Sequence, residues 1–125
     1  SKGYQYSGSN DQLEVGWVGE NSDSTFHAVG QLKSNELGLY DMTGNVSDWV
    51  SDWYNPEKDA QVSNKNPQGP PDGVFRISKG LSWFYNTRGE DGKPVPYGIH
   101  MPEVRYQSPP ETRNDGFGFR IARSK

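Results

Sequence analysis

The chain has 125 residues, of which 13 are basic and 16 are acidic, and its formal net charge is −3. This length corresponds to one domain or to part of one. The small net charge and the mixture of signs argue against nucleic acid and against an anionic membrane surface as partners. Because the chain contains no cysteine, disulfides, thiolate metal sites and a cysteine nucleophile are excluded within it.

The composition predicts a folded but loop-rich domain. Hydrophobic residues make up only 30% of the chain, a share that would also suit disorder. Aromatic residues nevertheless reach 13%, and disordered segments are poor in them. The 15 glycines and 9 prolines favour short strands joined by loops. We find no apolar run long enough to span a membrane and no signal peptide, and the polar start at Ser1 is typical of the middle of a longer protein.

Residues 1–34 are expected to form a polar lead-in loop. The apolar cluster at residues 15–18 predicts an anchored loop or a one-turn element within it. A loose alternation over residues 26–29 predicts a short strand. His27 lies in that segment without a pattern of partners around it, so a surface histidine is favoured over a ligand or a base.

The segment Asn35–Tyr54 is expected to be the centre of the core, because it holds two of the four tryptophans in an otherwise polar chain. Trp49 and Trp53 are four residues apart, so they share a face in a helix and also in a strand. Residues 46–54 are rich in β-branched and aromatic side chains. We therefore favour a short strand that follows a turn at Gly44 and Asn45.

Two carboxylates of this segment, Asp48 and Asp52, also share a face under either assignment. Closely spaced carboxylates beside a Gly-Asn turn can bind a cation. Two solvated aspartates that flank buried rings explain the same spacing, and the spacing alone favours this second interpretation.

The second half of the chain predicts short extended segments between loops. Residues 55–72 are expected to be a loop, since Gly-Pro-Pro is incompatible with a helix. Residues 87–98 predict a solvated loop. In the last extended segment, Phe117, Phe119 and Ile121 would face one way. The predicted extended segments are Val74–Ile77, a shorter piece over Lys79–Trp83, Glu103–Gln107 and Phe117–Arg123.

Four arginines recur near these predicted strands, namely Arg76, Arg105, Arg113 and Arg120. The planar guanidinium is well suited to ion pairs with carboxylates. We expect these arginines to pin loops by binding backbone carbonyls and acids, and the alternative is a pocket for a carboxylate or phosphate ligand. Ser82 lies in KGLSW rather than in G-x-S-x-G, so a serine nucleophile has no support.

Four motifs in one order resemble the formylglycine-generating-enzyme/sulfatase-modifying-factor family. NELGLYDMTGNVSDWVSDWY is similar to the family pattern N-x-x-G-L-Y-D-M-x-G-N-V-W-E-W-x-x-D-W-Y. Lys79–Trp83 (KGLSW) resembles R-G-G-S-W, and Asn66–Pro70 (NPQGP) resembles N-P-x-G-P. The ending R-x4-P-x2-R-x4-G-F-R is matched by Arg105, Pro110, Arg113 and Gly118–Arg120.

The resemblance implies an α+β, loop-rich fold with short antiparallel strands, similar to C-type lectins. This chain would be the C-terminal portion, a single partial domain over residues 1–125 with a motif-bearing core at residues 35–125. Family members usually carry an upstream helix of R-L-P-T-E-A-E-W-E type, and nothing here matches it. The expected partner is therefore the missing N-terminal half of the domain, or else a protein or peptide.

The resemblance implies no copper chemistry in this chain. Oxidising family members use two cysteines upstream of the arginine that Arg105 matches, and Tyr97 and Pro102 stand at those positions. Because thiolate is the donor that Cu(I) prefers, no copper is expected. His100 falls close to these positions and is the remaining candidate ligand there.

The resemblance also implies a structural calcium site at the Gly-Asn turn. Oxidising members bind this ion through backbone carbonyls and the glutamate that Asp48 replaces. Carried over, the ligands are Gly44 and Val46 by carbonyl, Asn45 by carbonyl or side chain, and Asp48 by carboxylate. Hard oxygen ligands suit Ca²⁺. The alternative is an Asp48 that caps the turn or pairs with an arginine.

Two classes of function stay open, and we favour a non-catalytic binding or scaffold module. The alternative is an enzyme of the family with a cysteine-independent oxidoreductase or tailoring activity, its metal site completed by another chain or domain. A pocket would have aromatic and guanidinium walls that suit an extended peptide or a small acid. Its predicted residues are Trp83, His100, Arg105, Tyr106 and Arg113. The resemblance favours an extracytoplasmic location.

Overall fold

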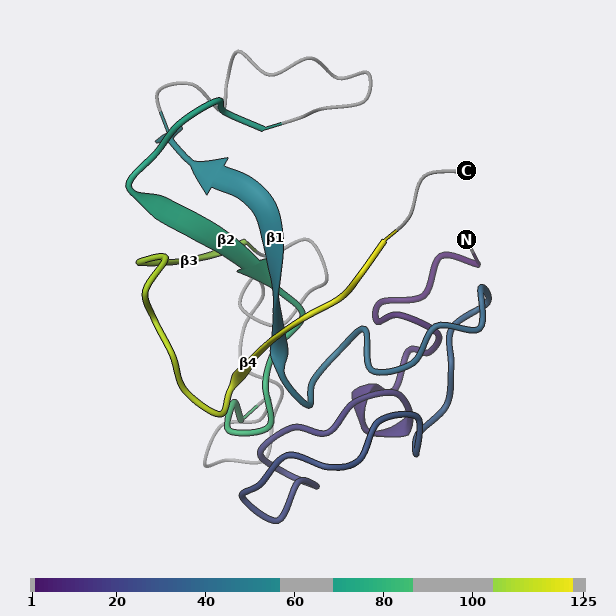
Figure 1. Cartoon of the computed structure of the whole chain (residues 1–125). Helices are drawn as coiled ribbons and strands as arrows, with labels where there is room; N and C mark the ends of the chain where they lie inside the picture. Colours follow the sequence, from purple (N-terminus) through teal and green to yellow (C-terminus); the bar gives the residue numbers. More distant parts are fainter. Residues whose placement is uncertain (1, 57–68, 87–104, 123–125) are drawn as a thin grey trace.

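The computed structural model describes residues 2–56, 69–86 and 105–122. Figure 1 shows the strands in one curved sheet, with residues 2–46 running as coil beside the start of β1. None of the described segments is a helix able to cross a membrane. The elements in chain order are the 3₁₀ turn η1 (Gln12–Glu14) and the strands β1 (Ser47–Tyr54), β2 (Phe75–Lys79), β3 (Tyr106–Ser108) and β4 (Phe117–Phe119).

The four strands pair in the order β3-β2-β1-β4. β1 and β3 both run antiparallel to β2, whereas β4 runs parallel to β1. The prediction of antiparallel strands is therefore wrong at β4. After β3, at one edge of the sheet, the chain passes to the opposite edge, and such a crossover can bring a strand in parallel to its new neighbour.

The predicted strand over residues 46–54 is confirmed as β1. It follows a turn in which Gly44 and Asn45 both have positive φ, at 73° and 64°. The register against β2 shifts between Trp49 and Trp53, and such an irregularity bends a strand. The two rings take different partners. Trp49 stacks on Phe117 with 4.7 Å between ring centroids, and Trp53 lies under the Arg76 guanidinium.

The buried apolar core is aliphatic rather than aromatic. Among the described residues its members are Val15, Val18, Ile77 and Leu81. The tryptophans are only half-buried, so the prediction that the aromatics of Asn35–Tyr54 form the centre of the core is wrong. The described part of the chain contains one sheet and coil, without a second layer that would enclose such wide rings.

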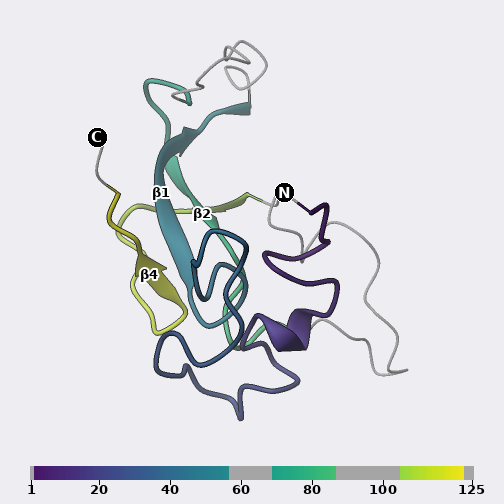
Figure 2. The ribbon, with the colours of Figure 1, turned by 90° about the vertical axis from the view of Figure 1, so that its right-hand side faces the viewer.

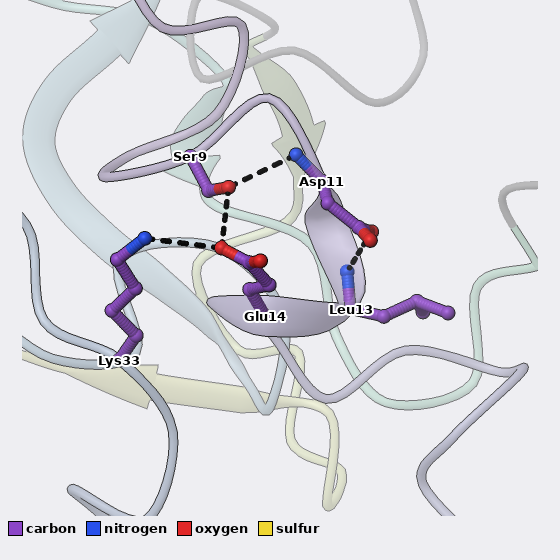
Figure 3. A network of polar contacts seen from close by, with 5 residues as sticks. All are labelled: Ser9, Asp11, Leu13, Glu14 and Lys33. Carbon is purple, nitrogen blue, oxygen red and sulfur yellow. Dashed lines mark hydrogen bonds and ion pairs between the residues drawn. The ribbon is translucent and has the colours of Figure 1, made fainter.

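The residues 15–18 do anchor the lead-in segment, as predicted, and polar contacts hold the rest of it (Figure 3). Ser9 Oγ donates a hydrogen bond of 2.8 Å to the Glu14 carboxylate, and Lys33 Nζ lies 3.0 Å from the same carboxylate. The hydrogen bond from Ser9, followed by the contacts of Lys33, lowers the pKa of Glu14. Asp11 caps η1 by accepting the Leu13 N–H at 3.1 Å.

The predicted strand over residues 26–29 is wrong. Asp23 and Ser24 have positive φ, so the chain turns before this segment, and Val29 is 81% exposed. No strand is assigned to residues 26–29. A loose alternation of apolar residues therefore does not form a strand where no neighbour pairs with it.

A turn separates the two extended segments predicted over Val74–Ile77 and Lys79–Trp83. The strand expected over Val74–Ile77 is confirmed as β2, but Gly80 and Leu81 have positive φ and turn the chain after Lys79. An extended piece over Lys79–Trp83 is therefore wrong.

The strand predicted at the C-terminal end is also shorter in the structure. β3 is confirmed within the described part of the segment 103–107. β4 ends at Phe119, after which the chain leads away from β1 (Figure 2). Of the side chains predicted to face one way, Phe119 is 75% and Ile121 is 90% exposed, so they are not part of the core.

Candidate functional site

The Gly44–Asn45 turn joins three segments of the chain. Asn45 N–H donates to the Trp17 carbonyl at 2.7 Å, and the Asn45 carbonyl accepts the Trp83 N–H at 2.8 Å. The Asn45 side chain accepts the His27 N–H at 2.9 Å and donates to the His27 carbonyl at 3.0 Å. A Cβ on Gly44 would meet the Trp17 carbonyl oxygen at 2.3 Å. Glycine is therefore required here by its close neighbour as well as by its positive φ.

His27 serves this junction rather than standing free on the surface. Its ring stacks on Trp17 with 3.9 Å between centroids, and its Nε2 lies 2.8 Å from the Ser22 carbonyl oxygen. The predicted surface histidine is thus half-buried. Within residues 2–56, 69–86 and 105–122, no group of three His, Cys, Asp or Glu side chains could hold a metal ion.

Asp48 is paired with Arg120, as one alternative foresaw. Arg120 Nε lies 2.5 Å from Asp48 Oδ2, and Arg120 Nη2 donates to the Asp41 carbonyl at 2.6 Å. Burial raises the pKa of the Asp48 carboxyl; the hydrogen bond and charge of Arg120 oppose this shift, and the charge of Asp41 adds to it. The prediction of a solvated Asp48 is wrong, because its side chain is only 18% exposed and forms an ion pair with Arg120.

Two further arginines take a backbone carbonyl or an acid as partner, as expected, but these partners belong to the strand β1 rather than to a loop. Arg76 Nη1 donates to the Ser51 carbonyl at 2.5 Å. Arg105 Nη2 lies 3.6 Å from Asp52 Oδ2, so Asp52 also faces an arginine. Arg113 is exposed.

The four predicted calcium ligands fit the ion only in part. Gly44, Asn45, Val46 and Asp48 lie together before and at the start of β1, and their donor atoms are oxygens. However, both polar atoms of the Asn45 side chain are bound to the His27 backbone, and the Asp48 carboxylate is bound to Arg120. Calcium requires six to eight oxygens. The residues therefore fit the ion only if Arg120 releases Asp48, and the calcium site stays a prediction.

If calcium binds at this turn, it competes with Arg120 for Asp48. We then expect saturating calcium to raise Tm, relative to EDTA, by more in Arg120→Gln than in the unmodified chain, because ligand binding to the folded state stabilises it. Differential scanning calorimetry of both proteins measures this. If neither protein responds to calcium or EDTA, the prediction of a calcium site is wrong.

The structure brings two of the predicted ligand-binding residues into one row of rings. Trp83 meets Phe84 edge-on at 5.4 Å between centroids, Phe84 lies 4.6 Å from Tyr85, and Tyr85 stacks on Tyr106 at 5.7 Å. We call these four residues the aromatic row. Phe84 and Tyr85 were missed by the sequence analysis, although their place directly after Trp83 was a usable signal. His100 lies outside the described residues.

Neighbouring groups fix both ends of the aromatic row. Trp83 Nε1 donates to the Asp115 carbonyl at 3.3 Å, and the Trp83 N–H is held by Asn45. At the other end, Tyr106 belongs to β3 and pairs with Ser78 of β2. Burial, with a smaller contribution from Tyr85, raises the pKa of the Tyr106 phenol to about 12.

The shifted pKa of Tyr106 predicts a loss of stability in alkali. Because the folded-state pKa lies above the usual 10.0, the fold favours the neutral phenol. That contribution is complete below about pH 10 and is lost as the pH rises from about 10 towards 12. Tyr106→Phe is expected to reduce the dependence of the free energy of unfolding on pH in this window. Urea titrations of both proteins measure it, and equal slopes would contradict the assignment.

The chain is similar to known proteins, which show the family to which it belongs. The family model described as "Sulfatase-modifying factor enzyme 1-like domain" matches residues 2–125. "Chaperone protein LppX" of Paenibacillus barcinonensis is 30% identical over 145 aligned positions, which cover 100% of this chain and 43% of that protein. The formylglycine-generating enzyme of Bos taurus is 33% identical over 94 positions, covering 75% of this chain and 23% of the enzyme.

A solved structure agrees with these sequence relatives. Treponema denticola variable protein 1 superposes with a TM-score of 0.69 at 28% identity, over 93% of this chain and 39% of that protein. The chain thus spans less than half the length of each of these three proteins. The resemblance drawn from the four motifs is confirmed, and the chain belongs to the sulfatase-modifying factor enzyme 1-like family.

Proposed function

We propose that this chain is a non-catalytic binding module of its family and that its ligand is an extended peptide segment of another protein. The observation that carries this proposal is the aromatic row. Phe84 is exposed and the other three rings are half-buried, so parts of their surfaces are open to a ligand. Half-exposed aromatic side chains supply large contact area at low entropic cost.

An arginine adjacent to Tyr106 in the sequence supports a peptide ligand with acidic groups. Arg105 directly precedes Tyr106, and its side chain is 36% exposed although Asp52 lies 3.6 Å away. A guanidinium binds carboxylates in a bidentate geometry, through two parallel hydrogen bonds. Trp83, held through both its backbone and its indole nitrogen, would present a rigid surface at the other end of the row. Rigid rings lose little entropy on binding.

The chemistry of the chain supports binding rather than catalysis. It contains no cysteine, so it offers no thiolate to Cu(I). The relative from Paenibacillus barcinonensis is named a chaperone protein, and a chaperone acts by binding other proteins. A cysteine-independent enzyme remains the alternative proposal, as the bovine relative is named an enzyme.

The finer fold assignment belongs to the same proposal. A C-type-lectin-like fold, of which this chain is the C-terminal portion, is supported by the short curved sheet and the long connections between its strands. Such a fold presents loops on a rigid sheet, which is a common arrangement for binding surfaces.

Peptide binding is tested with an array of immobilised ten-residue peptides that vary in acidic and aromatic content. We expect the chain to select acidic and aromatic peptides. Phe84→Ala should weaken the selected interactions by about tenfold, because truncating an aromatic anchor costs more than about 1 kcal/mol. Circular dichroism checks that the variant folds.

The matched control is Leu37→Ala, which removes an apolar side chain that is 82% exposed and outside the aromatic row. It should bind like the unmodified chain. The proposal is overturned if no peptide binds above background, or if Phe84→Ala and Leu37→Ala bind equally well.

A further inference from the structure

A second surface, distinct from the aromatic row, lies where β4 ends. A hollow of about 440 Å³ opens between β4 and the loop that precedes the Gly44–Asn45 turn. We call this hollow the β4 groove. Its apolar lining residues, which we call the walls, are Val29, Leu39, Tyr40 and Phe119, and its charged lining residues, which we call the floor, are Asp41, Asp48 and Arg120.

The walls of the β4 groove expose apolar side chains from two parts of the chain. Val29 belongs to the lead-in segment, and Phe119 belongs to β4, which pairs with β1. Ile121, two residues beyond Phe119, is also exposed. Exposed apolar side chains that gather in one place are typical of an interaction surface. β4 is moreover an edge strand of the sheet, and edge strands readily accept another chain.

The floor of the β4 groove carries more negative than positive charge. Two carboxylates, Asp41 and Asp48, line the groove with one guanidinium, that of Arg120, which pairs with the Asp48 carboxylate and binds only the backbone carbonyl of Asp41. Asp41 is only 7% exposed; its Oδ2 accepts the Gly30 N–H at 2.7 Å, while its Oδ1 has no hydrogen-bond partner. A buried carboxylate oxygen without a partner is costly. The floor therefore favours an occupant that brings a positive group.

We propose that the β4 groove is the docking site for the remaining part of a sulfatase-modifying-factor domain. The occupant is an extended apolar segment with a lysine or arginine beside it. The family relation supplies the argument for this occupant: the chain spans 43% of the Paenibacillus protein and 39% of the Treponema protein. More than half of each relative is thus formed by residues that this chain does not match, and apolar surface exposed here is surface that such a part can bury.

The charge and shape of the groove add to this choice of occupant. Apolar side chains would pack between Val29 and Phe119, and the cationic group would lie over the floor near Asp41. A second copy of this chain fits less well, because it would bring an equally acidic groove and like charges repel across an interface.

The test uses the part of the Paenibacillus barcinonensis relative that this chain does not match, prepared as a separate polypeptide and titrated into the chain. Isothermal titration calorimetry is expected to show a one-to-one complex. Phe119→Asp should weaken it at least about tenfold, because a charge would be buried against an apolar segment. Phe119 is exposed, so the free variant should melt like the unmodified chain.

The matched control is Val74→Asp, at a side chain that is 76% exposed and not part of the β4 groove. It should bind like the unmodified chain. If Phe119→Asp fails to fold, Val29→Asp, at another wall residue of the groove, takes its place. Phe84→Ala should leave this complex unchanged, which separates the result from peptide binding at the aromatic row.

Three results would overturn the proposal. The first is the lack of a complex at any concentration reached in the titration. The second is equal weakening by the groove variant and the Val74→Asp control. The third is a dimer of the chain alone that dissociates when Phe119→Asp is introduced, which would assign the groove to a second copy.

Discussion

The turn at Asn45 is the constraint on which the described structure depends. One buried side chain and its backbone make hydrogen bonds to Trp17, His27 and Trp83, which belong to segments far apart in the sequence. Few apolar side chains among the described residues are fully buried, so such polar contacts hold much of the described structure together. A buried amide whose nitrogen and oxygen are both hydrogen-bonded also specifies one arrangement over others, because each alternative leaves polar atoms without partners.

The turn at Asn45 positions residues of both proposed surfaces. The Asn45 carbonyl holds the Trp83 backbone and with it the start of the aromatic row. On the other side, β1 begins directly after the turn, and Asp48 binds Arg120 at the end of β4, beside the β4 groove. Peptide binding and docking of the rest of the domain would therefore use different surfaces that share one support.

The sequence predicted the turn, the strand after it, the loop-rich character and the family. Motifs of defined residue types and spacing are enough to predict these features, because each motif is short and specific to the family. It could not predict the parallel pairing of β4, which depends on a crossover between distant segments. The aliphatic core was missed as well, since the aromatic content of Asn35–Tyr54 says nothing about whether a second layer covers it. Phe84 and the β4 groove became visible only once distant residues were placed side by side.

The account is tested most directly by the free energy of unfolding of Asn45→Ala, measured by urea titration. The substitution removes two side-chain hydrogen bonds to His27 and places alanine at φ 64°. We expect a loss of about 3–4 kcal/mol, from roughly 1 kcal/mol for each of the two hydrogen bonds and roughly 1–2 kcal/mol for the left-handed conformation. A loss below about 0.5 kcal/mol, the usual range for an unremarkable surface position, would contradict the central role of this turn.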